Sequence, residues 1–465
     1  MNNDHILVFD VGKTNVKLIL LNQVGHQLST INKSNTIINE PPYPHYDIEG
    51  IWKWFLSETK KVANKYRIST IAISTHGAAA ALVDIENSTL LLPVMDYEFE
   101  DYPVAIGDYD DKRPDFNCSF SPKLSAGLNL GRQLFYQLSL LSDDEREKAT
   151  LLFYPAYWAW RLSTIATTEI TSVGCHTDLW NFKTNRFSDL VTELGLKDKI
   201  PAMIKAWQPV GIIKKELVQQ TGIDENCVIF PGLHDSNAGL IQYLSPNSLP
   251  PTVISTGTWV VAMDPKTPLD TLVEEKDMLA NINIMGEPIA TARYMGGREF
   301  EKICALTGAD VCDKMSTHDI HSILEQEIFA FPSFISGSGP YPEKKGNISG
   351  SPKNGKVLAT IYSALMINEL LNNLQSSGNI VIEGRFAGNR TLCSLLAALR
   401  PNQNIFIQNE TTGIAEGCAK LVHWHDKQIV RLGEKVVPFQ SCRLDKYASK
   451  WRRKLSQNKQ VLDDK

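Results

Sequence analysis

The segment "HILVFDVGKTNVKLILLN" (residues 5–22) decides the fold of the first half of the chain. Apolar residues run on both sides of "GKTN", which predicts two β-strands joined at a bend that contains a glycine. An amphipathic helix over residues 50–67 and a buried strand over residues 70–75 follow this hairpin. This order of strands, helix and strand predicts one mixed α/β sheet.

The second half of the chain opens in the same way. The segment "PTVISTGTWVVAMD" (251–264) consists of two apolar stretches that meet at "TGTW", and it follows a Pro/Ser-rich linker over residues 245–251. Helical and strand patterns alternate afterwards up to residue 425. Two halves that each open with a glycine-bent hairpin predict a duplicated nucleotide-binding fold with a cleft between two domains, residues 1–247 and 248–465.

Composition limits the class of protein. The chain has 465 residues, of which 43% are hydrophobic and 21% charged, with a formal net charge of −5. These values predict a globular protein of more than one domain, with no basic field for nucleic acid or an anionic membrane. No apolar run approaches the ~20 residues that cross a bilayer, and no signal peptide is expected. The eight cysteines form no CxxC motif, which favours reduced thiols and a cytoplasmic location.

Each hairpin places a glycine and a threonine at its bend. There, backbone N–H groups can point at an anion without a Cβ atom in the way, and the threonine adds a hydroxyl donor. Asp10 precedes the first bend and is placed to hold Mg²⁺ through water. Lys17 either reaches a phosphate or is a solvated strand residue. One such hairpin alone is usually structural, but two in one chain indicate phosphate binding. The candidate residues are Gly12, Thr14, Gly257 and Thr258.

A third element, "NIVIEGRFAGNR" (379–390), follows the second hairpin. Its strand pattern ends at Gly384 and a helix begins near Asn389. A nucleoside could approach the backbone closely at such a turn. Taken alone, the same pattern describes an ordinary strand-to-helix corner.

The segment "PGLHDSNAGL" (231–240) places an acid, Asp235, after an apolar run. A carboxylate here could act as a general base, or it could cap the helix that the small residues begin. His234 could orient Asp235 or be a histidine satisfied by the fold. His76 and Asp96 each follow strand-like stretches.

Four motifs in this order, "FDVGKTNVKLILLN", "PGLHDSNAG", "ISTGTWVVAM" and "VIEGRFAGNRTLC", resemble those of the FGGY carbohydrate kinases. These kinases are two-domain members of the actin/Hsp70/hexokinase superfold. The resemblance extends over roughly residues 5–425. "HDS" followed by "STGTW", and "TDLWN" at 177–181, are most similar to the L-fuculose and L-rhamnulose kinase branch.

This resemblance implies ATP and Mg²⁺ as cofactors. It also implies a role for each matching residue: a metal-associated acid, Asp10; a catalytic base, Asp235; phosphate contacts at Gly12, Thr14, Lys17, Gly257 and Thr258; and an adenosine motif at Gly384 and Asn389. The resemblance also makes His234, His76 and Asp96 candidates for sugar binding. Members of the family often contact the sugar at the position of His76, and packing is the alternative for this histidine.

Two positions depart from the family pattern. Arg385 stands where a glycine is usual, and Lys13 stands in the first bend, where its charge lies beside the phosphates or faces solvent.

The sequence therefore predicts ATP-dependent phosphorylation of a small ketose at a primary hydroxyl. L-Fuculose, L-rhamnulose and a pentulose are the expected substrates, and the family predicts a homodimer. The alternative is a nucleotide-dependent switch, or a catalytically degenerate sugar sensor, on the same fold. Asp235 favours the enzyme, whereas the loss of glycine at Arg385 favours the alternative.

Three other stretches are given structural interpretations. "YPAYWAWRL" (154–162) is predicted to pack in the core. "HDIHS" (318–322) is predicted to lie on a surface helix rather than to bind zinc, and the basic segment 446–459 is predicted to be a solvated terminal helix or tail.

Overall fold

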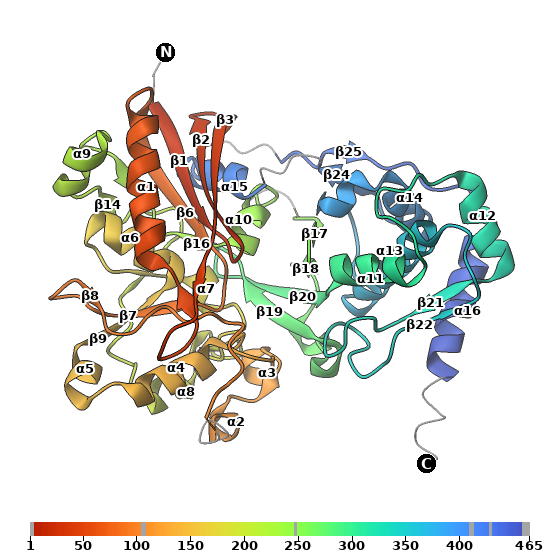
Figure 1. The fold of residues 1–465 in the computed structure, drawn as a ribbon, viewed down its shortest axis with the longest axis horizontal. Coiled ribbons are helices and arrows are strands. Elements are labelled where there is room, and N and C mark those ends of the chain that lie inside the picture. The colour runs from red at the N-terminus through yellow and green to blue at the C-terminus, as the bar shows by residue number, and fades with distance from the viewer. Residues whose placement is uncertain (1–3, 104–107, 246–248, 409–412, 427–429, 458–465) are drawn as a thin grey trace. The chain divides into compact units, whose positions relative to one another are not determined.

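The computed structural model describes residues 4–103, 108–245, 249–408, 413–426 and 430–457 (Figure 1). The chain forms two compact units. Unit 1 comprises Met1–Ser248, Ala280–Pro288 and Thr412–Val430, and unit 2 comprises Leu249–Leu279, Ile289–Thr411 and Arg431–Lys465. The chain therefore returns twice to unit 1 after first leaving it. Residues 246–248 of the expected linker lie outside the described residues.

Unit 1 is built on a mixed sheet with strand order β14-β15-β6-β1-β2-β3, and β16 also pairs with β6. Strand β1 (Asp4–Val11) pairs antiparallel with β2 (Asn15–Asn22) and parallel with β6 (Arg67–Thr75). The predicted hairpin and the strand that follows it thus lie side by side at the centre of this sheet.

Two helices cover one face of β1. Successive residues of a strand point to opposite faces, so alternate side chains of β1 meet these helices. Phe9 lies against Phe55 of helix α1 (Ile48–Ala63) and Trp158 of α6 (Tyr154–Ser163), with ring centroids 4.7 and 5.2 Å away. Both rings belong to one buried cluster. Helix α6 is almost wholly buried, so the predicted core packing of residues 154–162 is confirmed.

Unit 2 repeats this arrangement in a sheet of order β19-β20-β18-β17-β23-β24-β25. Strand β17 (Thr252–Thr256) pairs antiparallel with β18 (Val260–Asp264) and parallel with β23 (Ile380–Gly384). Helix α13 (Gly355–Asn373) is buried along most of its length. The predicted α/β class with a duplicated mixed sheet is therefore confirmed.

The other elements complete the two units. Those of residues 27–241 are β3 (Gln27–Ser34), β4 (Ile37–Ile38), β5 (His45–Tyr46), β7 (Ala80–Asp84), β8 (Thr89–Leu90), α2 (Asp108–Lys112), α3 (Phe116–Ser119), α4 (Leu130–Leu140), α5 (Asp143–Lys148), β9 (Ala149–Phe153), β10 (Thr168–Glu169), α7 (Ile170–Val173), β11 (Trp180–Asn181), β12 (Arg186–Phe187), α8 (Asp189–Glu193), β13 (Met203–Ile204), β14 (Gly211–Ile212), α9 (Lys215–Thr221), β15 (Val228–Ile229), β16 (Leu233–His234) and α10 (Asp235–Ile241). Those that follow are the short helices Leu269–Thr271, Glu274–Lys276 and Arg385–Gly388, then β19 (Met278–Ile282), β20 (Pro288–Tyr294), α11 (Gly296–Leu306), α12 (Thr317–Gln326), β21 (Phe329–Phe331), β22 (Asn347–Ser349), α14 (Arg390–Leu399), β24 (Ile405–Gln408), α15 (Gly413–Val422), β25 (Glu434–Lys435) and α16 (Leu444–Gln457). No described helix is both long and apolar enough to span a membrane.

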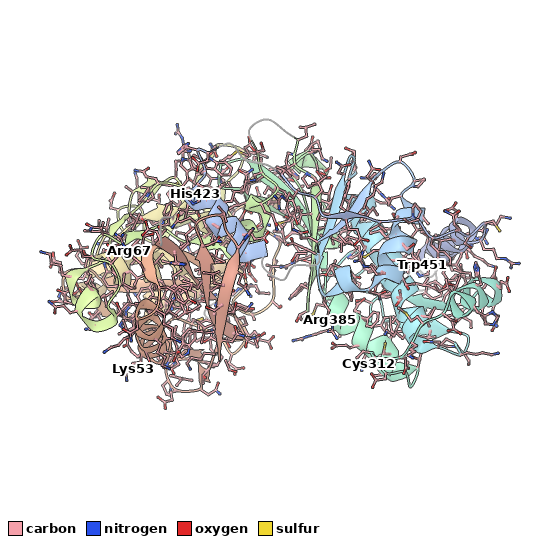
Figure 2. The ribbon with its side chains drawn as sticks, turned by 90° about the horizontal axis from the view of Figure 1, so that it is seen from above. Lys53, Arg67, Cys312, Arg385, His423 and Trp451 are labelled. Atoms are coloured by element: carbon pink, nitrogen blue, oxygen red, sulfur yellow. The ribbon has the colours of Figure 1, made fainter. Side chains whose placement is uncertain are left out.

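The structure corrects the interpretation of the basic C-terminal segment. Helix α16 is docked rather than solvated, because its apolar side is buried in unit 2. Trp451, labelled in Figure 2, is fully buried, and its Nε1 donates to the Ala330 carbonyl oxygen at 2.8 Å. The basic residues occupy the other side of an amphipathic helix. Residues 458–465 lie outside the described part of the chain.

Candidate active site

The carboxyl ends of three neighbouring strands bring the polar residues of unit 1 together. Asp10 of β1 lies opposite Ser74 of β6, and His234 of β16 lies opposite Thr75. These pairs are parallel, so their carboxyl ends meet at one edge of the sheet, where ligands of α/β proteins commonly bind. The hairpin bend after β1 and the start of α10 after β16 lie at this same edge.

Asp10 is buried and unusually basic for a carboxylate. Burial raises its pKa from 3.8 to about 7, with a further rise from the charge of Asp235 that the neighbouring Lys17 opposes. Lys17 Nζ lies 3.8 Å from Asp10 Oδ2. A buried carboxylate with so high a pKa favours the approach of a cation, because a positive charge stabilises its ionised form.

Asp235 is the first residue of α10, and His234 holds the N-cap position. The structure therefore does not show Asp235 as the N-cap of this helix. Asp235 Oδ1 accepts from the Ser236 backbone N–H at 2.6 Å, and the side chain stays 30% exposed. This exposure leaves the carboxylate accessible to a substrate hydroxyl.

Helix α15 holds α10 in place. Gly417 of α15 lies so close to the Ala238 carbonyl oxygen that a Cβ atom would clash with it. Lys420 Nζ donates to the carbonyl oxygens of Gln242, at 3.1 Å, and Leu244, at 2.7 Å, just beyond the end of α10. Helix α15, which packs against α10 and so helps to position Asp235, thus lies nearly 180 residues further along the chain.

Two buried histidines flank Asp235. His234 Nε2 lies 3.4 Å from Asp235 Oδ1, and burial lowers the pKa of this histidine. Burial also lowers the pKa of His76 to about 4, so its imidazole is neutral near pH 7. His76 Nδ1 lies 2.8 Å from the Gly77 carbonyl oxygen and must carry the proton to donate there. Its Nε2 is then a buried acceptor without a partner among the described residues.

A second group of charges adjoins His76. Lys13 Nζ forms an ion pair with Asp96 Oδ1 and lies 3.4 Å from Glu98 Oε2. The ammonium also faces the rings of Tyr97 and Tyr46, with centroids 4.9 and 5.4 Å away. Lys13 and Asp96, predicted for different ligands, are therefore direct partners.

Glu169 and Thr171 form hydrogen bonds that stabilise this edge of the sheet, and no sequence pattern singled them out. Thr171 donates to Glu169 Oε2 through its backbone N, at 2.9 Å, and its Oγ1, at 2.5 Å. Thr171 Oγ1 in turn accepts from the His234 backbone N–H at 3.2 Å. Burial raises the pKa of Glu169 to about 8. No spacing in the sequence links residues 169–171 to residue 234.

In unit 2, the bend Gly257–Thr258 follows β17. Thr256 Oγ1 donates to the Glu383 carbonyl oxygen at 2.5 Å and accepts from the Phe386 backbone N–H at 2.8 Å. Gly384 has φ of 80°, and a Cβ atom there would lie far inside van der Waals contact with the Thr256 carbonyl oxygen. The hairpin and the start of the third motif are thus joined through the backbone.

Asn389 is the N-cap of α14, as the sequence predicted for a helix opening near it. Its side chain accepts from the Leu392 backbone N–H at 3.1 Å and donates to Thr360 Oγ1 at 3.2 Å. Arg385, labelled in Figure 2, pairs with Glu301 at 2.6 Å on the surface of unit 2. The residue that replaces the usual glycine thus has a carboxylate partner of its own.

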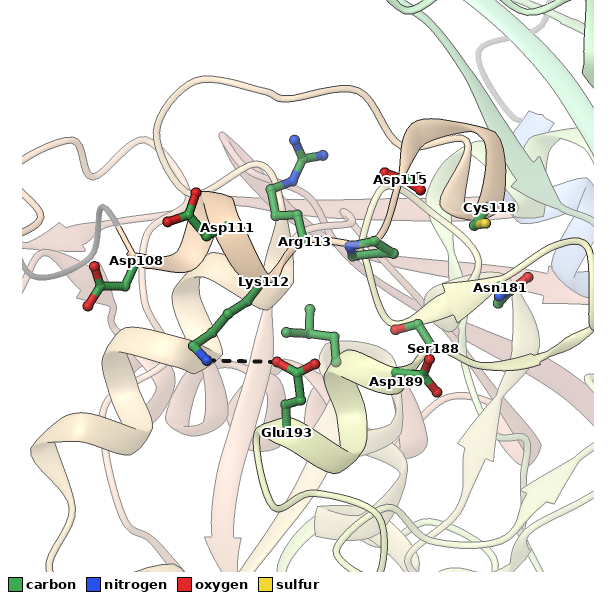
Figure 3. Close-up of a pocket in the computed structure, with 12 residues that line it drawn as sticks. Asp108, Asp111, Lys112, Arg113, Asp115, Cys118, Asn181, Ser188, Asp189 and Glu193 are labelled. Atoms are coloured by element: carbon green, nitrogen blue, oxygen red, sulfur yellow. Dashed lines mark ion pairs between the residues drawn. The ribbon is translucent and has the colours of Figure 1, made fainter.

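A separate pocket of about 690 Å³ lies in unit 1 between α2 and α8. Figure 3 shows acidic side chains around it, with Lys112 Nζ 3.8 Å from Glu193 Oε2. Asn181 of "TDLWN" lines this pocket, but none of the predicted catalytic, metal-binding, phosphate-binding or sugar-binding residues does. Other histidines are not part of this pocket. His423 of "HWH" (423–425) pairs with Asp426, and "HDIHS" (318–322) lies on α12. The described residues contain no group of three or more His, Cys, Asp or Glu side chains that could hold a metal.

Comparison with known proteins identifies the family. The model described as "FGGY family of carbohydrate kinases, N-terminal domain" matches residues 5–97, and "Carbohydrate kinase FGGY, C-terminal domain" matches residues 248–429. The chain belongs to the FGGY family of carbohydrate kinases. The crystal structure of a carbohydrate kinase from Novosphingobium aromaticivorans is 31% identical, with a TM-score of 0.88 over 98% of this chain and 99% of that one.

Two further relatives of this FGGY chain are more distant. The L-fuculokinase of Escherichia coli K12 is 24% identical over 287 residues, which are 58% of this chain and 58% of that protein. The chain thus matches less than two thirds of the length of this curated relative. A ligand-bound xylulose kinase from Lactobacillus acidophilus, 15% identical with a TM-score of 0.78, shares the fold over 99% of both chains.

Proposed function

We propose that this protein transfers the γ-phosphate of ATP to a primary hydroxyl of a small ketose, namely L-fuculose, L-rhamnulose or a pentulose. The observation that carries the proposal is the group formed by Asp10, His76 and Asp235 at one sheet edge. Asp235 is a partly exposed carboxylate whose charge acts on both of the others. The similarity to L-fuculokinases and xylulose kinases supports a ketose acceptor.

Asp235 acts as the general base in this proposal. The acceptor oxygen forms a bond to the γ-phosphorus, the bond to the bridging oxygen of ADP breaks, and the hydroxyl proton moves to Asp235. A positioned base of this kind contributes about 10²–10⁴ in rate. His234, neutral and in contact with Asp235, keeps the carboxylate oriented without adding a charge. His76 Nε2 accepts a hydrogen bond from another hydroxyl of the sugar.

The residues of both hairpins fit a nucleotide. A Cβ atom built on Gly257 would meet nothing within 4 Å, so the fold itself leaves room at this bend for an anion. Thr258, and Gly12, Thr14 and Lys17 in unit 1, would supply donors to the phosphates, while the turn Gly384–Asn389 would border the adenosine. Asn389 would act there through the backbone, because its side chain already caps α14.

Asp10 would hold Mg²⁺. Mg²⁺ is usually held by one or two carboxylates together with phosphate oxygens and water rather than by an all-protein cage. A single buried carboxylate beside the phosphate-binding bend matches that pattern. When bound, the ion supplies neutralisation of the charge that develops on the phosphates.

Three wider features complete the proposal. Residues 1–247 bind the sugar and part of the phosphate chain, and residues 248–465 bind the nucleotide. The enzyme acts in the cytoplasm, as its unpaired cysteines suggest. It forms a homodimer, as the family resemblance implies.

The test is ADP release with Mg²⁺-ATP across L-fuculose, L-rhamnulose and both enantiomers of ribulose and xylulose. Asp235→Asn is run in parallel, and Asp224→Asn is the matched control. Asp224 pairs with Arg67 at 2.7 Å, at the opposite end of β6 (Arg67 is labelled in Figure 2). We expect turnover of one ketose that falls about 10²–10⁴-fold in Asp235→Asn and stays unchanged in Asp224→Asn.

Turnover that survives Asp235→Asn would keep the kinase and remove the base. ATP binding without turnover of any ketose would instead favour a nucleotide-dependent switch or a sugar sensor on this fold.

A further inference from the structure

The ammonium of Lys13 is already engaged by carboxylates within unit 1. Its side chain is 19% exposed, and its Nζ pairs with Asp96 Oδ1 and lies 3.4 Å from Glu98 Oε2. Lys17, the other lysine of this hairpin, lies instead beside Asp10. The two lysines therefore belong to two different groups of charges, although they are only four positions apart in the sequence.

Two aromatic residues that contact Lys13 also contact His76. Tyr46 and Tyr97 face the Lys13 ammonium, and the same two rings contact the His76 imidazole, with centroids 5.0 and 5.5 Å away. The charges of Asp235, Lys13 and Asp96 all act on the titration of His76. Lys13 thus lies in the group of residues that includes the proposed base and the unpartnered acceptor Nε2 of His76.

A lysine in these surroundings offers little attraction to a triphosphate. Asp96 and Glu98 carry two negative charges against its single positive charge, and an anion brought close would meet net repulsion at short range. An ammonium has three protons. With two carboxylates as partners, one proton is left for a neutral acceptor atom such as a sugar hydroxyl.

We propose that Lys13 is a specificity-determining residue for the sugar: together with Asp96 it hydrogen-bonds hydroxyls of a neutral acceptor, and it does not contact the nucleotide phosphates. This inference rests on the proposed kinase function and deepens it. Lys13 gives the acceptor a donor, while Asp96 and Glu98 accept from its hydroxyls. A sugar acid is disfavoured, because its carboxylate would face three carboxylates, Asp96, Glu98 and Asp235, and one ammonium.

The test is a comparison of KM for the sugar and KM for ATP in the full-length protein. The variants are Lys13→Ala, Asp96→Asn, the double variant Lys13→Met with Asp96→Asn, and the control Lys53→Ala. Lys53 is an exposed lysine of α1 in the same unit (labelled in Figure 2). The double variant removes both charges at once, so it separates the loss of the sugar contact from the cost of leaving Asp96 buried without its partner.

Lys13→Ala should raise the sugar KM about tenfold or more, the effect of one lost hydrogen bond to a bound hydroxyl. KM for ATP should change less than about twofold. The double variant should bind sugar as poorly as Lys13→Ala while melting near the wild-type temperature, and Lys53→Ala should match the wild type. D-Gluconate, as a probe sugar acid, should support little turnover.

Three outcomes overturn the inference. A rise in KM for ATP with an unchanged sugar KM would assign Lys13 to the phosphates. Unchanged values for both would leave the ion pair a purely structural contact, and rapid turnover of D-gluconate would refute the neutral acceptor. The wild type and Asp235→Asn, assayed beside these variants, separate the two proposals. If the wild type turns over no ketose, the proposed function fails, and if Asp235→Asn is fully active, only the proposed base fails. If the wild type is an active kinase and Lys13→Ala behaves like it, this inference fails alone.

Discussion

The β1–β2 hairpin of unit 1 and the β17–β18 hairpin of unit 2 share one topology and differ in charge. In each, the first strand pairs antiparallel with the second and parallel with a later strand of the sheet. Residues 10–17, around the bend of the first hairpin, include three ionisable side chains: Asp10, Lys13 and Lys17. The bend of the second carries only small or hydroxyl-bearing residues before its tryptophan: Thr256, Gly257 and Thr258.

This difference shows two ways to build a hairpin bend that contains glycine and threonine. The side chains of the first hairpin are arranged by electrostatics, since its lysines lie beside three carboxylates from two different segments. The second is arranged by backbone contact, since glycines at 297 and 384 let neighbouring segments approach residues 256–258 closely. Substitutions in the first should therefore change chemistry, and substitutions around the second should change the fold.

The largest effect is expected at Asp10 in the charged hairpin. Asp10→Asn should lower kcat/KM for the preferred ketose about 10²–10³-fold, the range found when a charge-stabilising group is removed from an active site. Its melting temperature should not fall, because an amide is less costly to bury than a carboxylate. Steady-state kinetics and thermal unfolding of the same sample would check both expectations. A fully active Asp10→Asn variant would remove the functional contrast between the hairpins.

The second effect is expected at Gly384, beside the neutral hairpin. Gly384→Ala should destabilise the protein by about 2–4 kcal/mol, because the residue has positive φ and its new Cβ would overlap the Thr256 carbonyl oxygen. Chemical denaturation measures this change. The matched variant is Gly257→Ala, which should unfold like the wild type, since its Cβ would meet no neighbouring atom, but should bind ATP less tightly. Equal stability of the two variants would contradict this view of the second hairpin.

The smallest expected effect is a change of stability with pH, and it compares one buried glutamate of each unit, Glu169 and Glu299. The pKa of Glu169 is raised from 4.5 to about 8, so its proton is bound more tightly in the folded state. Its contribution to stability is complete below pH 4.5 and is lost as the pH rises through about 8. The stability of Glu169→Gln lacks this pH dependence. Between pH 5 and pH 8, the melting temperature of the wild type should therefore fall by several degrees relative to that of Glu169→Gln.

Glu299 of unit 2 serves as the contrasting variant. It accepts from the Ser333 hydroxyl, the Tyr362 hydroxyl and the backbone N–H groups of Phe334 and Ile335. An amide nitrogen cannot accept these bonds, so Glu299→Gln should melt lower than the wild type at every pH. Parallel pH profiles for wild type and Glu169→Gln would show that Glu169 is not the titrating group.

Several features of the fold follow from local patterns. Alternating apolar residues around a glycine predicted both hairpins, and the strand that ends at Gly384 and the helix capped by Asn389 were found where the sequence placed them. Helix ends were less accurate: the helix expected over 50–67 is Ile48–Ala63. Helix ends depend on caps and neighbouring turns, which periodicity does not reveal.

The candidate site was predicted only in part. Asp10, His76, His234 and Asp235 follow strand patterns, so the sequence could place them at one sheet edge. The ion pair of Lys13 with Asp96, the support of His234 by Thr171, and the packing of α15 against α10 could not be predicted. Each joins residues far apart in the chain, and a hydrophobic pattern carries no information on which distant side chains meet.

The sequence by itself determined the duplicated α/β architecture, the family and the polar residues that end the central strands, because these depend on local periodicity and on short motifs. The tertiary structure alone decided which charges become partners. It buried Asp10, His76 and Glu169, whose pKa values depend on burial and on neighbouring charges. It also placed Lys13 beside Asp96 rather than in solvent, since the bend and residue 96 become neighbours only when the chain has folded.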